Sequence, residues 1–576
     1  MKSGYWTREF IAGLFHLITP YWNSEEKKSA RLYLAAIITL TIAAVYMTLL
    51  LNEWFNSFYS ALQNYDSGAV YRGLLRFTGL AFAHIAFAVY SYYLQQRLAL
   101  RWRKWMTKNY LAKWTGQQMY YRLEMFSQGT ADNPDQRISE DINLFTARTL
   151  SFMSGLLRSA TTIVCFIFVL WNLSEILSFS AAGQEFHIYG YLVWTALAYS
   201  VLGTWITHKV GHRLVSLNYL QQKLEADFRF SMVRLRETAE SVAFYNGAAK
   251  EESFLSNRFV TLLRNTLFII KKQKQLSWLT NSYAQIAIIF PFVVAVPRYL
   301  SQNISLGGLM QIANCFGKVQ DAMSYFVDVY ASLAEWQSCA KRLLSFDRHI
   351  AAIEKETEEK SGSLVREETP DRLRLTDVTI SVPAMDENKR TREIISSASC
   401  TIKSGEHVIL KGPSGSGKST LLRTLAGFWP YVKGHISMPA PSEMMFIPQK
   451  PYIPMGTSAE AASYPLETAD KEILSPLLVE CGLSHLMEKT DTEADWSHIL
   501  SLGEQQKLAF VRVFLRKPKW VFLDEATSAM DEETEEKMYR LLTALPGTTV
   551  ISIGHRSTLD KWHDRVLRIT NGKLIG

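Results

Sequence analysis

A glycine-rich segment that begins at Gly412 has the residue types and spacing that hold phosphate groups. It reads GPSGSGKS, follows the apolar run Val408–Leu410 and precedes a helical pattern. Glycines let backbone N–H groups turn toward phosphate oxygens, and the N-terminus of the next helix attracts anions. The spacing matches G-x-x-x-x-G-K-[ST], whose lysine reaches the β- and γ-phosphates and whose hydroxyl ligates Mg²⁺. The residues expected to hold the triphosphate are Gly412, Pro413, Ser414, Gly415, Ser416, Gly417, Lys418, Ser419 and Thr420.

A second segment supplies two carboxylates. The apolar run Trp520–Leu523 predicts a buried strand, and it ends in Asp524 and Glu525. In triphosphate hydrolysis, the first such carboxylate holds Mg²⁺ and the second polarises the attacking water as general base. We therefore expect Asp524 to bind the metal together with Ser419, and Glu525 to be catalytic.

Just before that strand, Leu500–Gln506 reads LSLGEQQ. This segment resembles the signature sequence LSGGQ of ATP-binding cassette (ABC) proteins. The resemblance implies that Ser501, Gly503 and Glu504 contact ATP held by a partner subunit. Leu502 stands where the commonest form has glycine, and Glu504 stands where it has glutamine.

Other ABC motifs are also matched. Gln449 in FIPQKPY resembles the Q-loop residue that senses Mg²⁺, Ser528–Asp531 resembles the D-loop, and His555 in SIGHR resembles the switch histidine near the γ-phosphate. The adenine-stacking aromatic residue is missing, since it would fall near Val382 and residues 379–382 contain no ring. Base–aromatic stacking contributes about 1–3 kcal/mol, so we expect a weaker adenine contact or one made elsewhere.

The elements that position these residues occupy the second part of the chain. Residues 372–576 alternate strand-like and helical patterns, which predicts an α/β P-loop nucleotide-binding domain with a parallel sheet. Residues 346–371 are expected to be a linker, because the run 354–371 is rich in charge and poor in large apolar residues.

The first part of the chain contains apolar runs of membrane-spanning length. We expect an α-helical membrane domain over residues 32–345, with six spans at about 32–51, 74–94, 150–172, 188–207, 279–300 and 309–333. Lys and Arg alternate between the loops: 95–149 has nine and 208–278 has twelve, whereas 173–187 and 301–308 have none. The positive-inside rule then makes both termini cytoplasmic. Short outer loops and long inner helical loops resemble the ABC exporter architecture.

Residues 1–31 are expected to hold a helix in the membrane interface and not a cleavable signal. Trp6, Phe10, Leu17 and Tyr21 share one helical face, while Arg8 and Glu9 interrupt the apolar run. The net charge of +8 follows the loops of a membrane protein, so we expect no nucleic-acid partner. The five cysteines form no CxxC pair and predict neither a disulfide framework nor a zinc site.

The phrases between the motifs resemble particular branches of the ABC family. AGFWP, DWSHILSLGEQQ and SIGHRSTLDKWH are similar to subfamily D, which includes peroxisomal fatty-acyl transporters, while DNPDQRISEDI and ISLGGLMQ are similar to bacterial YddA-like and SbmA/BacA-like transporters. The bacterial resemblance implies a homodimer in a cell inner membrane, with import favoured, and peptides or cobalamin-like molecules as solutes. The other resemblance leaves open a peroxisomal membrane and a fatty acyl-CoA.

The sixth expected span carries polar residues at helical spacing. They are Gln311, Asn314, Lys318, Asp321, Tyr325 and Asp328. A charge at the centre of a membrane helix costs about 2.5–3.5 kcal/mol on insertion scales, so such a stripe must face a partner or water. One reading is a helix-packing seam with a Lys318–Asp321 pair; the other is a substrate cavity lined by Gln311, Asn314, Lys318 and Asp321.

The combined hypothesis is an ATP-driven transporter with ATP and Mg²⁺ as cofactors, in which two copies of the chain form one pathway for a polar or amphipathic solute. Two alternatives stay open. One is an ATP-gated regulator or channel with weak hydrolysis, which the presence of Glu525 and His555 argues against. The other is a heterodimer whose partner carries a degenerate site.

Overall fold

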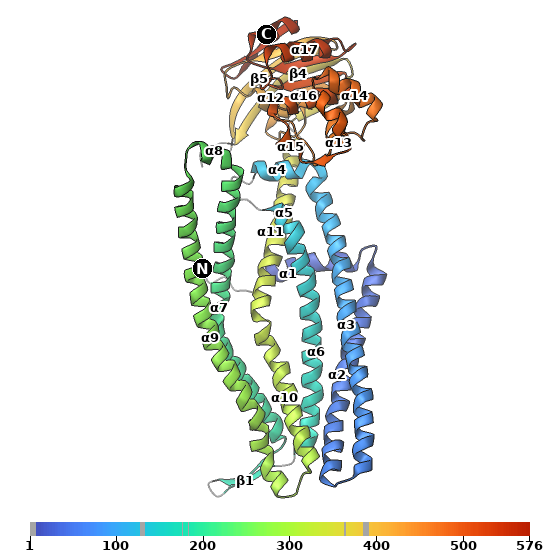
Figure 1. Cartoon of the computed structure of the whole chain (residues 1–576), viewed down its shortest axis with the longest axis vertical. Helices are drawn as coiled ribbons and strands as arrows, with labels where there is room; N and C mark the ends of the chain where they lie inside the picture. Colours follow the sequence, from blue (N-terminus) through green and yellow to red (C-terminus); the bar gives the residue numbers. More distant parts are fainter. Residues whose placement is uncertain (1–6, 127–132, 175–176, 182–183, 362–363, 384–390) are drawn as a thin grey trace. The chain divides into compact units, whose positions relative to one another are not determined.

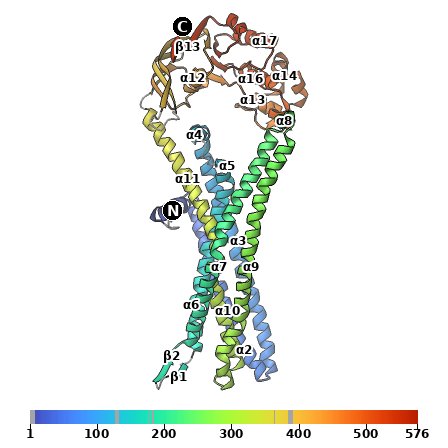
Figure 2. The ribbon, with the colours of Figure 1, turned by 90° about the vertical axis from the view of Figure 1, so that its left-hand side faces the viewer.

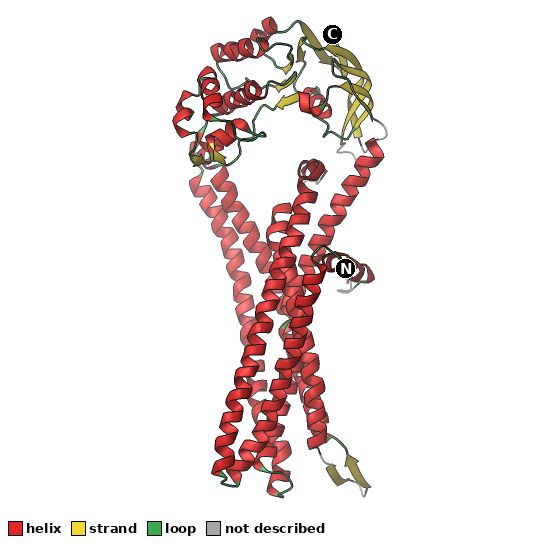
Figure 3. Ribbon diagram, turned by 90° about the vertical axis from the view of Figure 1, so that its right-hand side faces the viewer, coloured by secondary structure: helices red, strands yellow, loops and turns green. Residues whose placement is uncertain are grey.

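The structure is a computed structural model that describes residues 7–126, 133–174, 177–181, 184–361, 364–383 and 391–576. The chain divides into two compact units, which we describe separately. The first consists of residues 1–119 and 127–349, and the second of residues 120–126 and 350–576. The first unit is almost entirely helical, whereas the second combines helices with strands (Figure 3).

Long helices build the first unit (Figure 1). Its elements are α1 (Arg8–Trp22), α2 (Lys27–Gln63), α3 (Ser67–Thr115), η1 (Gly116–Gln118), α5 (Pro134–Gln136), η2 (Arg137–Asp141), α6 (Ile142–Leu173), β1 (Leu177–Ala181), β2 (Gln184–Ile188), α7 (Tyr191–Glu237), α8 (Ala239–Phe244), α9 (Ala248–Leu300) and α10 (Leu306–Asp328). Helix α11 (Tyr330–Ser361) begins in this unit and continues into the second. Helices α7 and α9 lie side by side and are joined through α8 (Figure 2).

The expected spans fall on six of these helices, with two differences. The fourth helix begins at Tyr191 and not at residue 188, because Ile188 ends the β1–β2 hairpin, and Gly190 turns the chain at a φ of +66°. The sixth expected span crosses from α10 into α11 at Val329. A short apolar run does not distinguish a strand from a helix by its periodicity, which explains the first difference.

Four helical stretches are long and apolar enough to cross a membrane, judged by length and composition over the described residues. They are Lys27–Gln63, Ser67–Met125, Pro134–Leu173 and Ala248–Leu300. Helices α7 and α10, which hold the fourth and sixth expected spans, are not among them. The helical membrane domain is thus confirmed, and the polar residues that interrupt α10 set it apart from the more apolar helices.

Helix α1 uses the face that the sequence predicted. Phe10, Leu17 and Tyr21 are buried, and the Tyr21 ring stacks on Trp102 of α3 with 5.6 Å between ring centroids. Trp6 lies outside the described residues. The amphipathic pattern of this segment therefore corresponds to packing against α3 within the first unit.

The second unit contains two main sheets. The six-stranded sheet has the order β14-β13-β6-β12-β11-β8, and only β14 runs antiparallel to its neighbour. The four-stranded sheet has the order β3-β7-β4-β5. The strands are β3 (Leu364–Glu368), β4 (Arg372–Pro383), β5 (Thr391–Lys403), β6 (His407–Lys411), β7 (Val432–Met438), β8 (Met444–Ile447), β9 (Gly456–Thr457), β10 (Glu493–Ala494), β11 (Trp520–Asp524), β12 (Thr549–Ile553), β13 (Arg565–Thr570) and β14 (Lys573–Ile575). This arrangement confirms the α/β prediction.

Helices and short helical turns complete the second unit. They are α4 (Met119–Phe126), α12 (Lys418–Leu425), η3 (Pro441–Glu443), α13 (Ser458–Ser463), α14 (Lys471–Glu480), η4 (Ser484–Lys489), α15 (Trp496–Ile499), α16 (Leu502–Arg516), α17 (Glu532–Thr543) and η5 (Ser557–Trp562). The buried strands β6, β11 and β12 are parallel neighbours, so their carboxyl ends share one edge of the sheet. Sites in open parallel sheets lie at that edge.

The segment expected to be a linker has regular structure. Helix α11 continues to Ser361, and Leu364–Glu368 form β3, which pairs in parallel with β7. The described part of residues 346–371 is therefore mainly a helix end and an edge strand. Its charged residues are compatible with both, because β3 is exposed along most of its length.

Candidate functional site

The glycine-rich loop joins β6 to α12 as the sequence predicts. Gly412, Gly415 and Gly417 have φ values of +159°, +78° and +99°, which residues with a Cβ rarely adopt. A Cβ on Gly412 would lie 2.7 Å from the backbone oxygen of Ile569. The glycines at these positions therefore let the backbone curve tightly into the N-terminus of α12.

Polar groups in this loop point to an anionic ligand. The Ser416 hydroxyl oxygen is buried and has no hydrogen-bond partner within the described structure. Lys418 is buried, and its Nζ donates to the carbonyl oxygens of Gly412 at 2.7 Å and Pro413 at 2.9 Å. Burial lowers the pKa of Lys418, while the charges of Glu525 and Asp524 act in the opposite direction. A triphosphate would give both groups the charged acceptor that they lack.

The end of β11 faces the start of α12. The Ser419 hydroxyl donates to Asp524 Oδ1 over 3.1 Å. Burial raises the pKa of Asp524, and the neighbouring charge of Glu525 adds to this, although the Ser419 hydrogen bond opposes it. A hydroxyl and a carboxylate this close offer the hard oxygen ligands that Mg²⁺ prefers. The residues present thus fit the expected metal.

Two side chains from other loops contact the carboxylate of Glu525. Gln449 Nε2 donates to Glu525 Oε2 over 3.1 Å, and His555 Nε2 lies 3.3 Å from Glu525 Oε1. The backbone of Glu525 has a φ of +50°, and its N–H donates to Ile553 at the end of β12. A non-glycine residue in this conformation is strained, and such strain is concentrated at functional sites. The parallel sheet therefore brings the predicted base, Q-loop glutamine and switch histidine together.

The signature loop begins helix α16 with a capping box. The Ser501 hydroxyl accepts from the Glu504 N–H, and the Glu504 carboxylate accepts from the Ser501 N–H over 2.9 Å. Burial would raise the pKa of Glu504, but the hydrogen bonds that its carboxylate accepts from the N–H and hydroxyl of Ser501, together with the charges of His485 and Lys507, hold it below its usual value. Leu502, the unusual residue, is 41% exposed. Its side chain thus extends from the loop without disturbing the cap.

Val382 lies near the end of β4 and is partly buried against the core of this unit. The strand places the position expected for the adenine-stacking ring close to residues 384–390, which lie outside the described residues. The predicted weakness of the adenine contact stays a prediction.

The polar stripe of α10 divides into two parts. Gln311 is buried and accepts a hydrogen bond from Asn56 Nδ2 of α2 over 2.9 Å, and Ser305 bonds to Ser60 over 2.9 Å. This end of the stripe is a packing seam. Lys318 is half-buried and Asp321 is exposed, and over the described residues neither forms an ion pair. The Lys318–Asp321 pair of the packing-seam reading is therefore not observed among the described residues.

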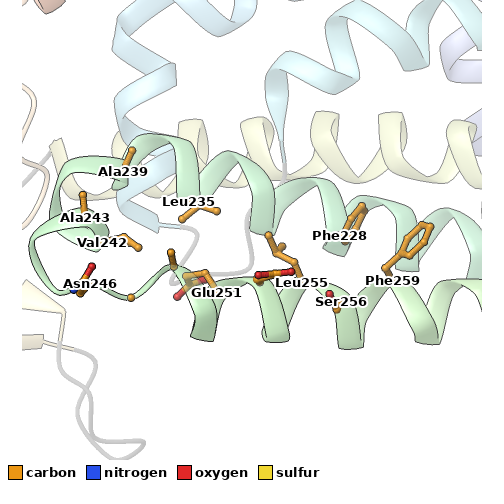
Figure 4. A pocket seen from close by; sticks show the side chains of 13 residues that line it. Phe228, Leu235, Ala239, Val242, Ala243, Asn246, Glu251, Leu255, Ser256 and Phe259 are labelled. Atoms are coloured by element: carbon orange, nitrogen blue, oxygen red, sulfur yellow. The ribbon is translucent and has the colours of Figure 1, made fainter.

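A cavity of about 640 Å³ lies elsewhere in the first unit, between α7, α8 and α9 (Figure 4). Phe228, Leu235, Leu255 and Phe259 form its apolar wall, and Glu251 adds a carboxylate. The stripe residues do not line this cavity. Asn314, like Lys318, is half-buried on α10.

Sequence reasoning missed two residues near the nucleotide site. Gln506 ends the signature segment and is fully buried, and Arg556 directly follows His555. Arg556 donates to the backbone carbonyl oxygens of Ser528 and Met530. Gln506 accepts from the N–H of Ala529 and donates to the carbonyl oxygen of Gln449. For Gln506, the available signal was a polar residue inside the apolar face of a helix, which requires a buried partner. Arg556 lies in the loop before η5 and gives no such signal.

Comparisons with protein families match both units. The family model described as ABC transporter transmembrane region 2 matches residues 16–300, and the one described as ABC transporter matches residues 395–528. The structure also resembles that of a bacterial Atm1-family ABC exporter with ATP bound, with a TM-score of 0.73, 17% identity and coverage of 95% of each chain. At that identity the likeness concerns the fold.

Curated relatives align over most of the chain. The inner membrane ABC transporter ATP-binding protein YddA of Escherichia coli is 33% identical over 95% of this chain and 96% of its own length. The chloroplastic ABC transporter D family member 2 of Arabidopsis thaliana is 32% identical over 96% of this chain and 85% of its own. The human lysosomal cobalamin transporter ABCD4 is 31% identical over 82% of this chain and 81% of its own.

Proposed function

Because the chain belongs to the ABC transporter family, we propose that two copies of it form an ATP-driven importer for a polar or amphipathic solute, in a bacterial inner membrane. The chain is a half-transporter in which an ABC ATPase domain is joined to a helical membrane domain. The meeting of Gln449, Asp524, Glu525 and His555 at one edge of the sheet is the observation that supports hydrolysis.

The chain's own groups have separate tasks in hydrolysis. The loop 412–420 binds the phosphates through backbone N–H groups, Ser416 and Lys418. Ser419, Asp524 and Gln449 would hold Mg²⁺, which would supply positive charge against the β- and γ-phosphates. Glu525 accepts the proton of the attacking water, and His555, 3.3 Å from Glu525 in this structure, supports the γ-phosphate.

The homodimer proposal rests on the fact that one chain alone makes an incomplete ATP site. One chain has one phosphate loop and one signature loop, so Ser501, Gly503 and Glu504 need a second chain's nucleotide. The complete set of catalytic residues supports two identical copies over a degenerate partner. Rapid dilution that leaves a monomer with full ATPase activity would refute this proposal.

The solute class rests on α10. Among the described residues, Lys318 and Asp321 of α10 have no ion-pair partner. A charged surface on a helix of the membrane domain suits a polar solute better than acyl chains. The YddA relative is named as an inner membrane protein, and ABCD4 as a cobalamin transporter, which supports the location and the solute class. The proposed direction of transport, import, rests on the resemblance to the bacterial branch of the family.

Proteoliposomes with outward-facing ATPase domains test the solute and the direction. We expect a peptide or cobalamin to stimulate hydrolysis and to move in the direction that corresponds to import. Lys318→Leu and Asp321→Leu should impair transport but leave basal hydrolysis intact, whereas Lys108→Leu, an exposed charge on α3, should change neither. Stimulation by acyl-CoA alone, with normal transport by both α10 variants, would contradict the proposal.

A further inference from the structure

The segment Ser528–Asp531, which follows Glu525, is held by two side chains that hydrolysis itself does not use. Its backbone is tied to that of the catalytic residue, because the N–H of Ser528 donates to the backbone carbonyl oxygen of Glu525 over 3.0 Å. Any shift of this segment therefore moves the backbone that carries Glu525. The contacts that fix this segment therefore also fix the position of the general base.

Gln506 of α16 holds the segment from one side. Its side chain is fully buried, and its Oε1 accepts from the N–H of Ala529 over 3.0 Å. Its Nε2 donates to the carbonyl oxygen of Gln449 over 2.8 Å and contacts the Ser528 hydroxyl at 3.2 Å. One amide thus connects the signature helix, the Q-loop backbone and the segment 528–531. Both ends of that amide are satisfied, so its position is defined.

Arg556 holds the segment from the other side. Its Nη1 donates to the carbonyl oxygen of Met530 over 2.9 Å, and its Nη2 donates to that of Ser528 over 3.1 Å. The planar guanidinium suits this two-point contact, which a lysine cannot reproduce. Since Arg556 follows His555, the switch histidine is linked to the same backbone.

A buried carboxylate fixes Arg556 in turn. Glu535 is 2% exposed and lies 3.4 Å from Arg556 Nη1. It also accepts hydrogen bonds from Thr527 at 2.7 Å and Thr558 at 2.6 Å. A buried charge is costly without partners, and these three donors supply them. Arg556 therefore has little freedom to leave the segment.

We propose that Gln506 and Arg556 are positioning residues that clamp Ser528–Asp531 and thereby keep Glu525, Gln449 and His555 in one arrangement. The clamp makes the rate of hydrolysis depend on the signature helix and on the switch segment together. Nucleotide affinity, which the loop 412–420 provides, is independent of it. The inference rests on the role of general base proposed for Glu525.

The test compares kcat, KM and the affinity for a non-hydrolysable ATP analogue in the full-length protein in lipid. Arg556→Met and Gln506→Met should each lower kcat by about tenfold to a hundredfold, the effect of losing buried hydrogen bonds. KM and analogue affinity should stay within about twofold. Arg556→Lys should restore part of kcat. The double variant should lose less than the product of the two single losses, since both act on one segment.

Arg565→Met is the matched control. Arg565 also donates to two backbone carbonyls, those of Thr401 at 3.0 Å and Gly576 at 2.8 Å, but on β13. An equal loss of kcat in this control, an effect confined to KM, or wild-type kcat in Arg556→Met would overturn the clamp. If Arg556→Met does not fold, Arg556→Lys and Gln506→Met decide by the same criteria. Wild-type hydrolysis by Glu525→Gln would instead refute the role of general base and leave the clamp untouched.

Discussion

Replacing Glu525 with glutamine isolates the basicity of the proposed general base. The glutamine has nearly the same size, and its oxygen can still accept the 3.1 Å hydrogen bond from Gln449. The strained backbone at φ +50° and the N–H bond to Ile553 do not depend on the carboxylate. The variant therefore changes charge and proton affinity while the surrounding loops stay in place.

The expected size of the effect follows from this geometry. General acid–base catalysis contributes about 10²–10⁴ in rate, which is about 3–5 kcal/mol of transition-state stabilisation. We expect kcat to fall by that factor. ATP affinity should be unchanged or slightly higher, because Glu525 is outside the phosphate loop and the loss of its negative charge reduces repulsion of the triphosphate.

Phosphate release measures kcat, and binding of labelled ATP in the presence of Mg²⁺ measures affinity. Glu536→Gln, an exposed carboxylate 2.9 Å from Lys561 in the same unit, is the matched control and should behave as wild type. Hydrolysis by Glu525→Gln at the wild-type rate would refute the assignment. A parallel loss of ATP binding would show that the substitution disturbs the phosphate loop.

Three further results are expected. Asp524→Asn should raise the thermal midpoint of the nucleotide-free protein at neutral pH, because burial raises the pKa of Asp524 and its charged form therefore destabilises the fold. The difference in midpoint between variant and wild type should shrink as the pH falls through that raised pKa. A difference that does not change with pH would contradict this expectation. Gly307→Ala should destabilise the membrane domain by about 1–3 kcal/mol, because its Cβ would collide with the backbone oxygen of Asn56. The control Gly317→Ala, on the same helix, places its Cβ in open space. Equal thermal midpoints of the two variants would exclude the close approach of α10 to Asn56. With no ring near Val382, kcat/KM for ATP should exceed that for GTP by about a hundredfold at most, and a larger ratio in a competition assay would reveal another group that reads adenine.

The sequence alone was sufficient where chemistry depends on local spacing. The loop from Gly412 to Ser419 and the carboxylates that end β11 are short segments whose backbone conformation and neighbours in the chain carry the information. Their strand and helix context also follows from apolar runs. The family, the two kinds of domain and the presence of an ATPase could be predicted for this reason.

Tertiary structure decided the contacts between distant segments. Asn56 and Gln311 are 255 positions apart, and only the packing of α2 on α10 makes the Gln311 end of the polar stripe a seam. Charge composition assigned Leu364–Glu368 to a linker, although pairing with β7 makes it a strand. The clamp of Gln506 and Arg556 on Ser528–Asp531 was equally invisible, because a buried polar side chain is defined by partners that the fold brings to it and not by its neighbours in sequence.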